Sequence, residues 1–166
     1  LTLLDSLTDV AASDWDAVAA PEQVDGRPLD PFTTHRFLSA LESSGSIGTG
    51  TGWQAAPLVL RDGGTLLAAT PLYIKTHSQG EYIFDHGWAD ALERAGGRYY
   101  PKLPIAVPCT PATGRRFRGP DDCRETLWRG AIAVTAQNRL SSLHATFCTP
   151  EEAEALAGVE GTLHRV

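Results

Sequence analysis

The pattern of apolar and polar positions near the start of the chain predicts a short helix. It would begin at about Ser13, with Ser13 as the N-cap and Asp16 three residues further on. Pro21 would close this helix, because proline cannot continue the helical hydrogen-bond pattern. The first part of the chain is therefore expected to be helical.

A second helix is predicted after Pro31. Thr33 or Thr34 would cap its start, and Gly45 would end it. Its apolar face would consist of Phe37, Leu38 and Leu41.

The period changes near Ala55, where two apolar runs predict a β-hairpin. The runs are 56–61 and 66–74, and Asp62-Gly63-Gly64 joins them. Asp-Gly sequences favour tight hairpin turns, because both residues tolerate a positive φ. The second run is apolar on both faces and so reads as a central strand, but Pro71 cannot donate a ladder hydrogen bond. We expect a β-bulge at Pro71.

The next segments predict two further helices and one extended piece. One helix would run from Asp85 as cap to Ala95 and stop at Gly96-Gly97. Residues 98–107 read as extended chain interrupted by prolines. The clearest helix carries apolar residues at spacings of four, four and three, namely Cys123, Leu127, Ala131 and Val134.

The last part of the chain predicts a strand, a helix and the start of another strand. Residues 141–148 alternate, and Leu143, Ala145 and Phe147 would share one face. Thr149-Pro150-Glu151-Glu152 combines a cap, a proline at the first helical position and a capping-box glutamate, and Gly158 would end that helix. Residues 162–166 read as extended.

These elements predict a single domain of the α/β (α+β) class. The length of 166 residues suits one domain with a full core. We expect residues 1–54 to supply N-terminal helices and a glycine-rich loop, and residues 55–166 to supply the sheet and its flanking helices. The order of elements resembles a sheet domain cut before its last strands.

The loop at 45–52 contains four glycines and has two interpretations. Glycine lets backbone N–H groups approach a phosphate, but a phosphate loop follows a strand and precedes a helix. Here the predicted order is the reverse, which favours a flexible connector.

Composition excludes several classes of protein. Fourteen basic residues against twenty acidic ones give a net charge of −6, which argues against a DNA-binding protein or a membrane-surface protein. The three cysteines fit neither a disulfide framework nor a zinc site, so we expect a cytoplasmic protein. The histidines are scattered, and no metal site is expected. Cys109 and Cys148 read as buried thiols.

The densest group of polar residues follows the predicted hairpin. His77, Glu81 and Asp85 are candidate general bases, since they come after a buried strand and lead into a helix. Each has an alternative: Asp85 could cap its helix, Glu81 could pair with Lys75, and His77 could be solvated.

Two other groups are candidates for binding. Tyr100 and Lys102, beside Tyr99, suit a planar or anionic substrate, and core packing of the tyrosines is the alternative. Arginines precede the clearest helix and could hold a phosphate; a solvated basic loop is the alternative. They are Arg115, Arg116 and Arg118.

Several strings of the sequence resemble a bacterial family of predicted N-acyltransferases. This is the FemAB-like group, described as peptidoglycan biosynthesis or recognition proteins. The strings that carry the resemblance cover most of the chain: 71–85, Trp88-Ala89-Asp90-Ala91, Arg98-Tyr99-Tyr100-Pro101-Lys102-Leu103, Val107-Pro108, Thr110-Pro111, Thr113-Gly114, 37–42 and 140–144.

The resemblance implies a GNAT-like domain, in which helices flank a central twisted mixed sheet, and a second such domain downstream in the intact protein. Its implied catalytic residues are Glu81, Asp85 and His77. Its implied substrate-binding residues are Lys75, Trp88, Tyr100, Lys102 and Thr110.

GNAT enzymes bind the pyrophosphate of coenzyme A with an Arg/Gln-x-x-Gly-x-Gly/Ala loop before a helix. Residues 116–121 match the first half of that loop and then end on an acid. The candidate cofactor-binding residues are Arg115, Arg116 and Gly119. Because of this departure from the motif, the alternative is that the acyl donor binds to the second domain.

The expected function is N-acyl or aminoacyl transfer onto an amine, with this domain contributing to the acceptor pocket. No tightly bound cofactor is expected, and acyl-CoA or aminoacyl-tRNA would be the co-substrate. The expected partner is a small molecule or cell-wall precursor, and homo-oligomerisation is left open. The alternatives are a recognition module without turnover and a degenerate structural domain.

Overall fold

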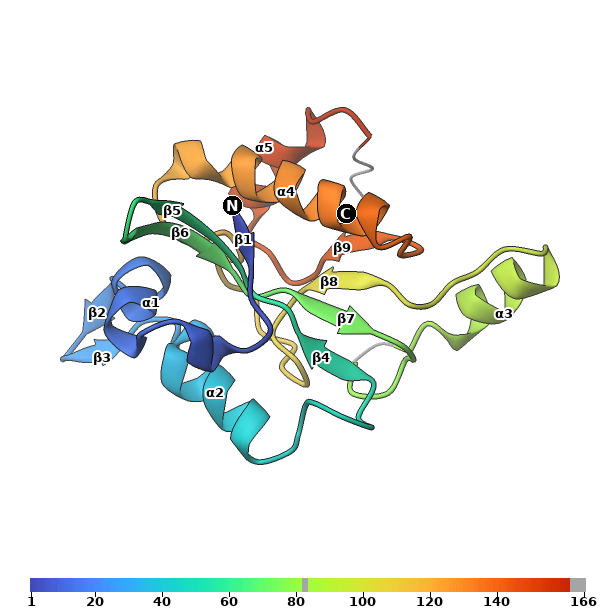
Figure 1. Ribbon diagram of the computed structural model, residues 1–166, viewed down its shortest axis with the longest axis horizontal. Coiled ribbons are helices and arrows are strands. Elements are labelled where there is room, and N and C mark those ends of the chain that lie inside the picture. The colour runs from blue at the N-terminus through green and yellow to red at the C-terminus, as the bar shows by residue number, and fades with distance from the viewer. Residues whose placement is uncertain (82–83, 162–166) are drawn as a thin grey trace.

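The computed structural model describes residues 1–81 and 84–161, and it contains short sheets flanked by helices (Figure 1). The helices are α1 (Ala12–Ala19), α2 (His35–Ser43), α3 (His86–Arg94), α4 (Arg124–Gln137) and α5 (Pro150–Ala157), with 3-10 turns η1 (Leu7–Asp9), η2 (Pro31–Thr33) and η3 (Asp121–Cys123). The strands are β1 (Thr2–Leu3), β2 (Gln23–Val24), β3 (Arg27–Pro28), β4 (Trp53–Ala55), β5 (Leu58–Asp62), β6 (Thr65–Thr70), β7 (Tyr73–Lys75), β8 (Leu103–Ile105) and β9 (Leu143–Ala145). The mixed α and β content confirms the predicted fold class.

The predicted hairpin is present as β5 and β6. These strands are antiparallel, and Asp62 pairs with Thr65 across the two-residue turn Gly63-Gly64. The expected bulge at Pro71 is wrong in position, because the register irregularity lies between Leu60 and Arg61. At Pro71 the strand instead breaks, so that β6 pairs with β5 while β7 pairs with β4.

The remaining strands pair at the edges of these sheets. Strands β7 and β8 are joined by isolated antiparallel bridges, Leu72 with Ile105 and Lys75 with Lys102. Strand β8 pairs with β9 in parallel, and α4 lies in the connection between them. Strand β1 pairs with β5 at the other side. The short sheets therefore run into one another through shared bridges.

Two layers of helices cover the two faces of the hairpin (Figure 1). Leu58 and Ala68 point into a core shared with α4 and α5. Their neighbours Val59 and Ala69 point the opposite way, into a core with Trp15 of α1 and with α2. This alternation follows from the two-residue period of a strand.

Most helix predictions are confirmed, with one corrected boundary. Helix α1 begins at Ala12 with Ala11 as its N-cap, so the expected cap at Ser13 is wrong. The Ser13 hydroxyl donates to Asp14 Oδ1, 3.3 Å away, rather than capping a backbone N–H. Thr34 caps α2 as expected.

The capping box of α5 is also present, and its glutamate has a second role. Glu152 is buried, and its carboxylate also accepts the backbone N–H groups of Arg116 and Phe117 at 2.8–3.0 Å. These bonds fix the long segment that links β8 to α4.

The predicted strand at 141–148 is shorter in the structure. Strand β9 spans Leu143–Ala145, and Phe147 adopts a φ of +53° and is exposed. Phe147 therefore does not share a buried face with the other two residues. The predicted extended piece at 162–166 lies outside the described residues.

Candidate functional site

A pocket of about 410 Å³ lies where the chain leaves strands β8 and β9. The parallel pairing ends at Ile105 and Ala145, and residues that follow each strand line the pocket. This volume is typical of small-molecule sites. We call it the β8–β9 pocket, and its lining comprises Trp53, Gly80, Glu81, Phe84, Asp85, Trp88, Tyr99, Lys102, Pro104, Ala106, Val107, Cys109, Thr110, Pro111, His144, Thr146 and Phe147.

The floor of the pocket is charged. The Lys102 ammonium lies 3.0 Å from Glu81 Oε1 and donates to Asp85 Oδ2. Tyr100 donates to the other Asp85 oxygen at 2.5 Å. Lys102 belongs to the segment before β8, and the carboxylates come from the segment between β7 and α3, so the bridge between β7 and β8 brings them together.

Asp85 is an ion-paired residue, and the alternative that it caps α3 is wrong. It occupies the N-cap position of that helix, but its side chain makes no capping hydrogen bond. Burial alone would raise its pKa, but hydrogen bonds from Lys102, Tyr100 and Ser78 outweigh it and hold the pKa well below its usual value. A base so weak is poorly matched to proton abstraction near neutral pH. Burial and Asp85 together raise the pKa of Tyr100 and raise that of Tyr99 to about 12.

Lys75 does not line the pocket but lies close to Glu81, which does. The Lys75 side chain is fully buried, and its ammonium donates to the Gln79 carbonyl at 2.5 Å. Glu81 Oε1 is 3.8 Å away, so the expected pairing exists, although Glu81 lies closer to Lys102. Burial lowers the pKa of Lys75 to about 8, against a smaller upward effect of Glu81.

His144 is a pocket residue that the sequence-based site did not include. It lies in β9, and its Nε2 is 2.7 Å from Ser142 Oγ. Burial and then the nearby Lys102 lower its pKa below 6.5, so the ring is neutral at pH 7. In the tautomer in which Nε2 carries the hydrogen and donates to Ser142 Oγ, the neutral imidazole can accept a proton at Nδ1.

The rim of the pocket is aromatic. Trp88 is 68% exposed and Phe84 is 60% exposed, although both line the pocket. Thr110, which lies in the segment that follows β8, also lines the pocket. Cys109 also lines it and is exposed with a φ of +57°, so its expectation as a buried thiol is wrong.

Comparison with known sequences gives one result. A model of the FemAB-like family, described as peptidoglycan biosynthesis/recognition, matches residues 6–166. The chain belongs to the FemAB-like family. This family implies a role related to peptidoglycan. No curated protein and no solved structure matches the chain significantly.

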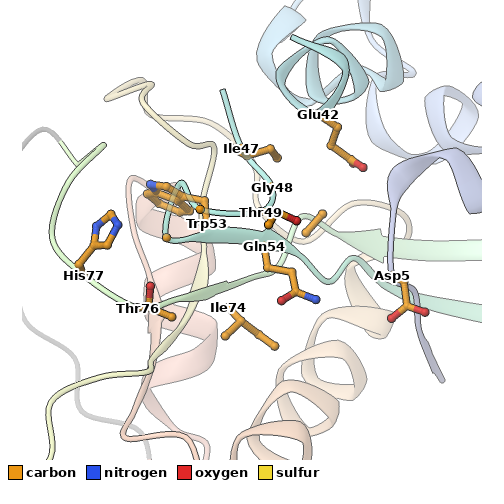
Figure 2. A pocket seen from close by; sticks show the side chains of 13 residues that line it. Asp5, Glu42, Ile47, Gly48, Thr49, Trp53, Gln54, Ile74, Thr76 and His77 are labelled. Carbon is orange, nitrogen blue, oxygen red and sulfur yellow. The ribbon is translucent and has the colours of Figure 1, made fainter. Parts of the chain in front are cut away.

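In this FemAB-like chain His77 does not line the β8–β9 pocket. His77 lines a second hollow of about 670 Å³ over β4 and β7, which we call the β4–β7 pocket. Figure 2 shows His77 and Trp53 at one end of it and Asp5 at the other. The glycine-rich loop forms part of its wall, and Gly52 lies so close to His77 that a Cβ there would be 2.0 Å from the ring.

The candidate cofactor-binding residues of the FemAB-like chain lie outside both pockets. Arg116 is buried, and its guanidinium donates to the carbonyls of Ala112, Gly114 and Thr146. Arg115 pairs with Glu22 and Asp121. Gly119 has a φ of +105°, and a Cβ there would be 2.5 Å from the Leu67 carbonyl. These three residues therefore hold the segment in place through internal contacts.

The described residues of the FemAB-like chain include neither a candidate metal site nor a helix that could span a membrane. No group of three or more His, Cys, Asp or Glu residues in residues 1–81 and 84–161 has metal-binding geometry. Within the same ranges, no helix has the length and apolar character needed to span a bilayer.

Proposed function

We propose that the protein transfers an acyl or aminoacyl group to an amine of a peptidoglycan precursor, and that the β8–β9 pocket is where the transfer takes place. One observation carries this proposal: the pocket combines a neutral histidine, His144, with a buried ammonium, Lys102. Acyl transfer to an amine requires a proton acceptor and a stabiliser of the oxyanion. The parallel pair β8 and β9 around α4 is consistent with the GNAT-like arrangement that the family resemblance implies.

The proposed roles follow from the geometry. The amine attacks the carbonyl carbon of the donor, and His144 takes the amine proton on its free nitrogen. The Lys102 ammonium stabilises the negative charge on the carbonyl oxygen. The bond from the carbonyl carbon to the donor oxygen or sulfur then breaks, and the proton passes to that leaving atom. An aminoacyl-tRNA or an acyl-CoA would supply the acyl group.

The two carboxylates have different positions in this scheme. Asp85 and Tyr100 hold the Lys102 side chain in position, because Asp85 accepts hydrogen bonds from both Tyr100 and Lys102. Glu81 is the more exposed carboxylate, with 21% of its side chain exposed. Glu81 is therefore the group proposed to hold the acceptor amine before it is deprotonated.

A second candidate is a recognition module that binds the precursor without turnover. The ion pairing of both carboxylates with Lys102 favours it, since charges already paired are poorly placed to move protons. In that case the pocket would bind the amine ligand and His144 would contribute only to packing.

A transfer assay separates the two functions. The chain would be incubated with acyl-CoA or aminoacyl-tRNA donors and a muramyl peptide, and the acceptor mass would be followed. Under the transferase proposal, His144→Gln lowers the rate by at least about 100-fold, because general-base catalysis contributes about 10²–10⁴-fold. His86→Gln is the matched control, since His86 is exposed and does not line the pocket. Binding of the muramyl peptide to the wild type with no transfer from any donor would establish the recognition module instead.

A further inference from the structure

Helix α3 carries an apolar face that is open to solvent. It extends away from the rest of the structure (Figure 1), and of its nine residues Ala89 is the buried one. Trp88 is 68% exposed and Leu92, one turn further on, is 42% exposed. Phe84, four residues before Trp88, is 60% exposed. Trp88 and Leu92 are four residues apart in the helix and so lie along one side of it, whereas Phe84 precedes the helix and its ring stacks on that of His86.

A bound partner on this face would help to explain the stability of so short a helix. Isolated helices shorter than about 12–15 residues are marginal in water, and most helical stability in proteins comes from packing of the apolar face. Leu92 lies against the Gly97 backbone, since a Cβ at Gly97 would be 2.6 Å from Leu92 Cδ1. That contact covers one side of Leu92 and leaves its remaining surface and that of Trp88 uncovered.

The apolar face is continuous with the β8–β9 pocket. Trp88 belongs to both, Phe84 lines the pocket beside it, and Leu92 follows Trp88 one turn further along the helix. The rise of an α-helix places Leu92 about 6 Å beyond Trp88 along the axis. The surface therefore changes from charged at Lys102 to apolar at the rim and stays apolar along α3.

Such a gradient fits an amphiphile. We propose that the pocket and the α3 face together bind a long-chain acyl group, with its carbonyl at Lys102 and its hydrocarbon chain across Trp88 and Leu92. This inference rests on the proposed function and names the class of acyl group that is transferred. The charges of α3 support a single chain over an anionic bilayer, because the helix carries Asp90, Glu93 and Arg94 and so has a net charge of −1.

Calorimetric titration with a series of acyl N-acetylcysteamine thioesters tests this inference. These probes keep the thioester carbonyl but carry no phosphate. A fully buried methylene contributes about 0.8 kcal/mol, or about fourfold in Kd, so a half-covered chain should gain about twofold per methylene between the butanoyl and dodecanoyl thioesters. A flat series would overturn the inference.

The variant Leu92→Ala tests whether the α3 face produces the increase in affinity with chain length. We expect it to weaken dodecanoyl binding about fivefold or more and to leave butanoyl binding unchanged, because a short chain ends before Leu92. Leu92→Met should restore the long-chain preference, which excludes simple unfolding of α3. Leu29→Ala is the matched control: Leu29 is 66% exposed and follows β3, at the opposite end of the molecule from α3 (Figure 1).

The outcomes separate the inference from the proposed function. Transfer of acetyl groups without any chain-length preference would keep the function and overturn the amphiphile site. Length-dependent binding that Leu92→Ala abolishes, without transfer to any amine, would keep the site and overturn the function. If Leu92→Ala instead reduces only binding to phosphatidylcholine vesicles, α3 contacts a bilayer and the inference is overturned.

Discussion

The ammonium of Lys75 lies 3.9 Å from the centre of the Trp53 ring. Trp53 and Lys75 are paired across β4 and β7 and so point to the same side of this two-stranded ribbon. The Trp53 indole N–H and the Lys75 ammonium both donate to the Gln79 carbonyl, at 3.0 and 2.5 Å. A buried lysine at the end of β7 is thus stabilised in its charged form by the face of an indole ring, a backbone carbonyl and Glu81.

The lowered pKa of Lys75 predicts a stability that rises with pH above neutrality. Its folded-state pKa is about 8 against 10.5 for the free side chain, so between these values the unfolded chain binds more protons. The free energy of unfolding of the wild type relative to Lys75→Met should therefore increase by about 2 kcal/mol from pH 7 to 9.5. Urea denaturation of both proteins at four pH values measures this. A constant difference across that range would contradict the lowered pKa.

Asp85 predicts the opposite pH window. Because its folded-state pKa lies below the ordinary value of 3.8, its contribution to stability is present above that value and is lost as the pH falls further. Asp85→Asn should cost about 2–4 kcal/mol at pH 7, since it leaves Lys102 with one carboxylate. Asp90→Asn, exposed on α3, should cost less than about 0.5 kcal/mol. The deficit of Asp85→Asn should shrink in denaturation experiments at pH 3, and an unchanged deficit would contradict the ion pair.

Glu152 should be far more sensitive than its neighbour. Glu152→Ala removes the acceptor of the Arg116 and Phe117 N–H groups and leaves both buried, so we expect a loss of about 3–5 kcal/mol. Glu151 is exposed, and Glu151→Ala loses only a favourable charge at the helix start, so its loss of stability should be much smaller than that of Glu152→Ala. Amide hydrogen exchange at Arg116 and Phe117 should accelerate only in Glu152→Ala. Equal stability of the two variants would show that the carboxylate does not hold this segment.

The glycine-rich loop offers a matched pair of substitutions. Gly50 and Gly52 both have a positive φ, +82° and +77°, but a Cβ at Gly50 meets open space while one at Gly52 meets His77. Gly50→Ala should cost about 1 kcal/mol from backbone strain alone. Gly52→Ala should cost about 2–4 kcal/mol, since the ring must also move. Thermal denaturation that shows the same loss for both would mean that His77 yields freely.

The elements that the sequence predicted well are those specified by neighbouring residues. The turn at Gly63-Gly64 and the capping box at Thr149 depend on a few adjacent side chains, and both are present. The start of α1 differs from the prediction, because its N-cap, Ala11, has no side chain that can cap a helix and so leaves no signal in the sequence. Pro71 predicts a bulge where the structure has a strand break, because only the pairing with β4 and β8 shows that the strand changes partners.

For the candidate site too, the sequence predicted the residues that are neighbours in the chain and missed those that only the fold brings together. Lys75, Glu81 and Asp85 lie within eleven residues, and the contiguous motif pointed to them. His144 joins them only through the parallel pairing of β8 with β9, about forty residues apart in sequence, which no local pattern shows. Arg116 looked like a free cation, because its carbonyl partners and Glu152 come from distant segments.

Trp53 forms a wall of both the β4–β7 pocket and the β8–β9 pocket. A ligand that enters either cavity therefore changes the surroundings of the same indole. The other three tryptophans are Trp15, Trp88 and Trp128, so a variant in which Trp53 alone remains would carry one fluorophore between two binding sites. Its emission would register occupancy of either pocket.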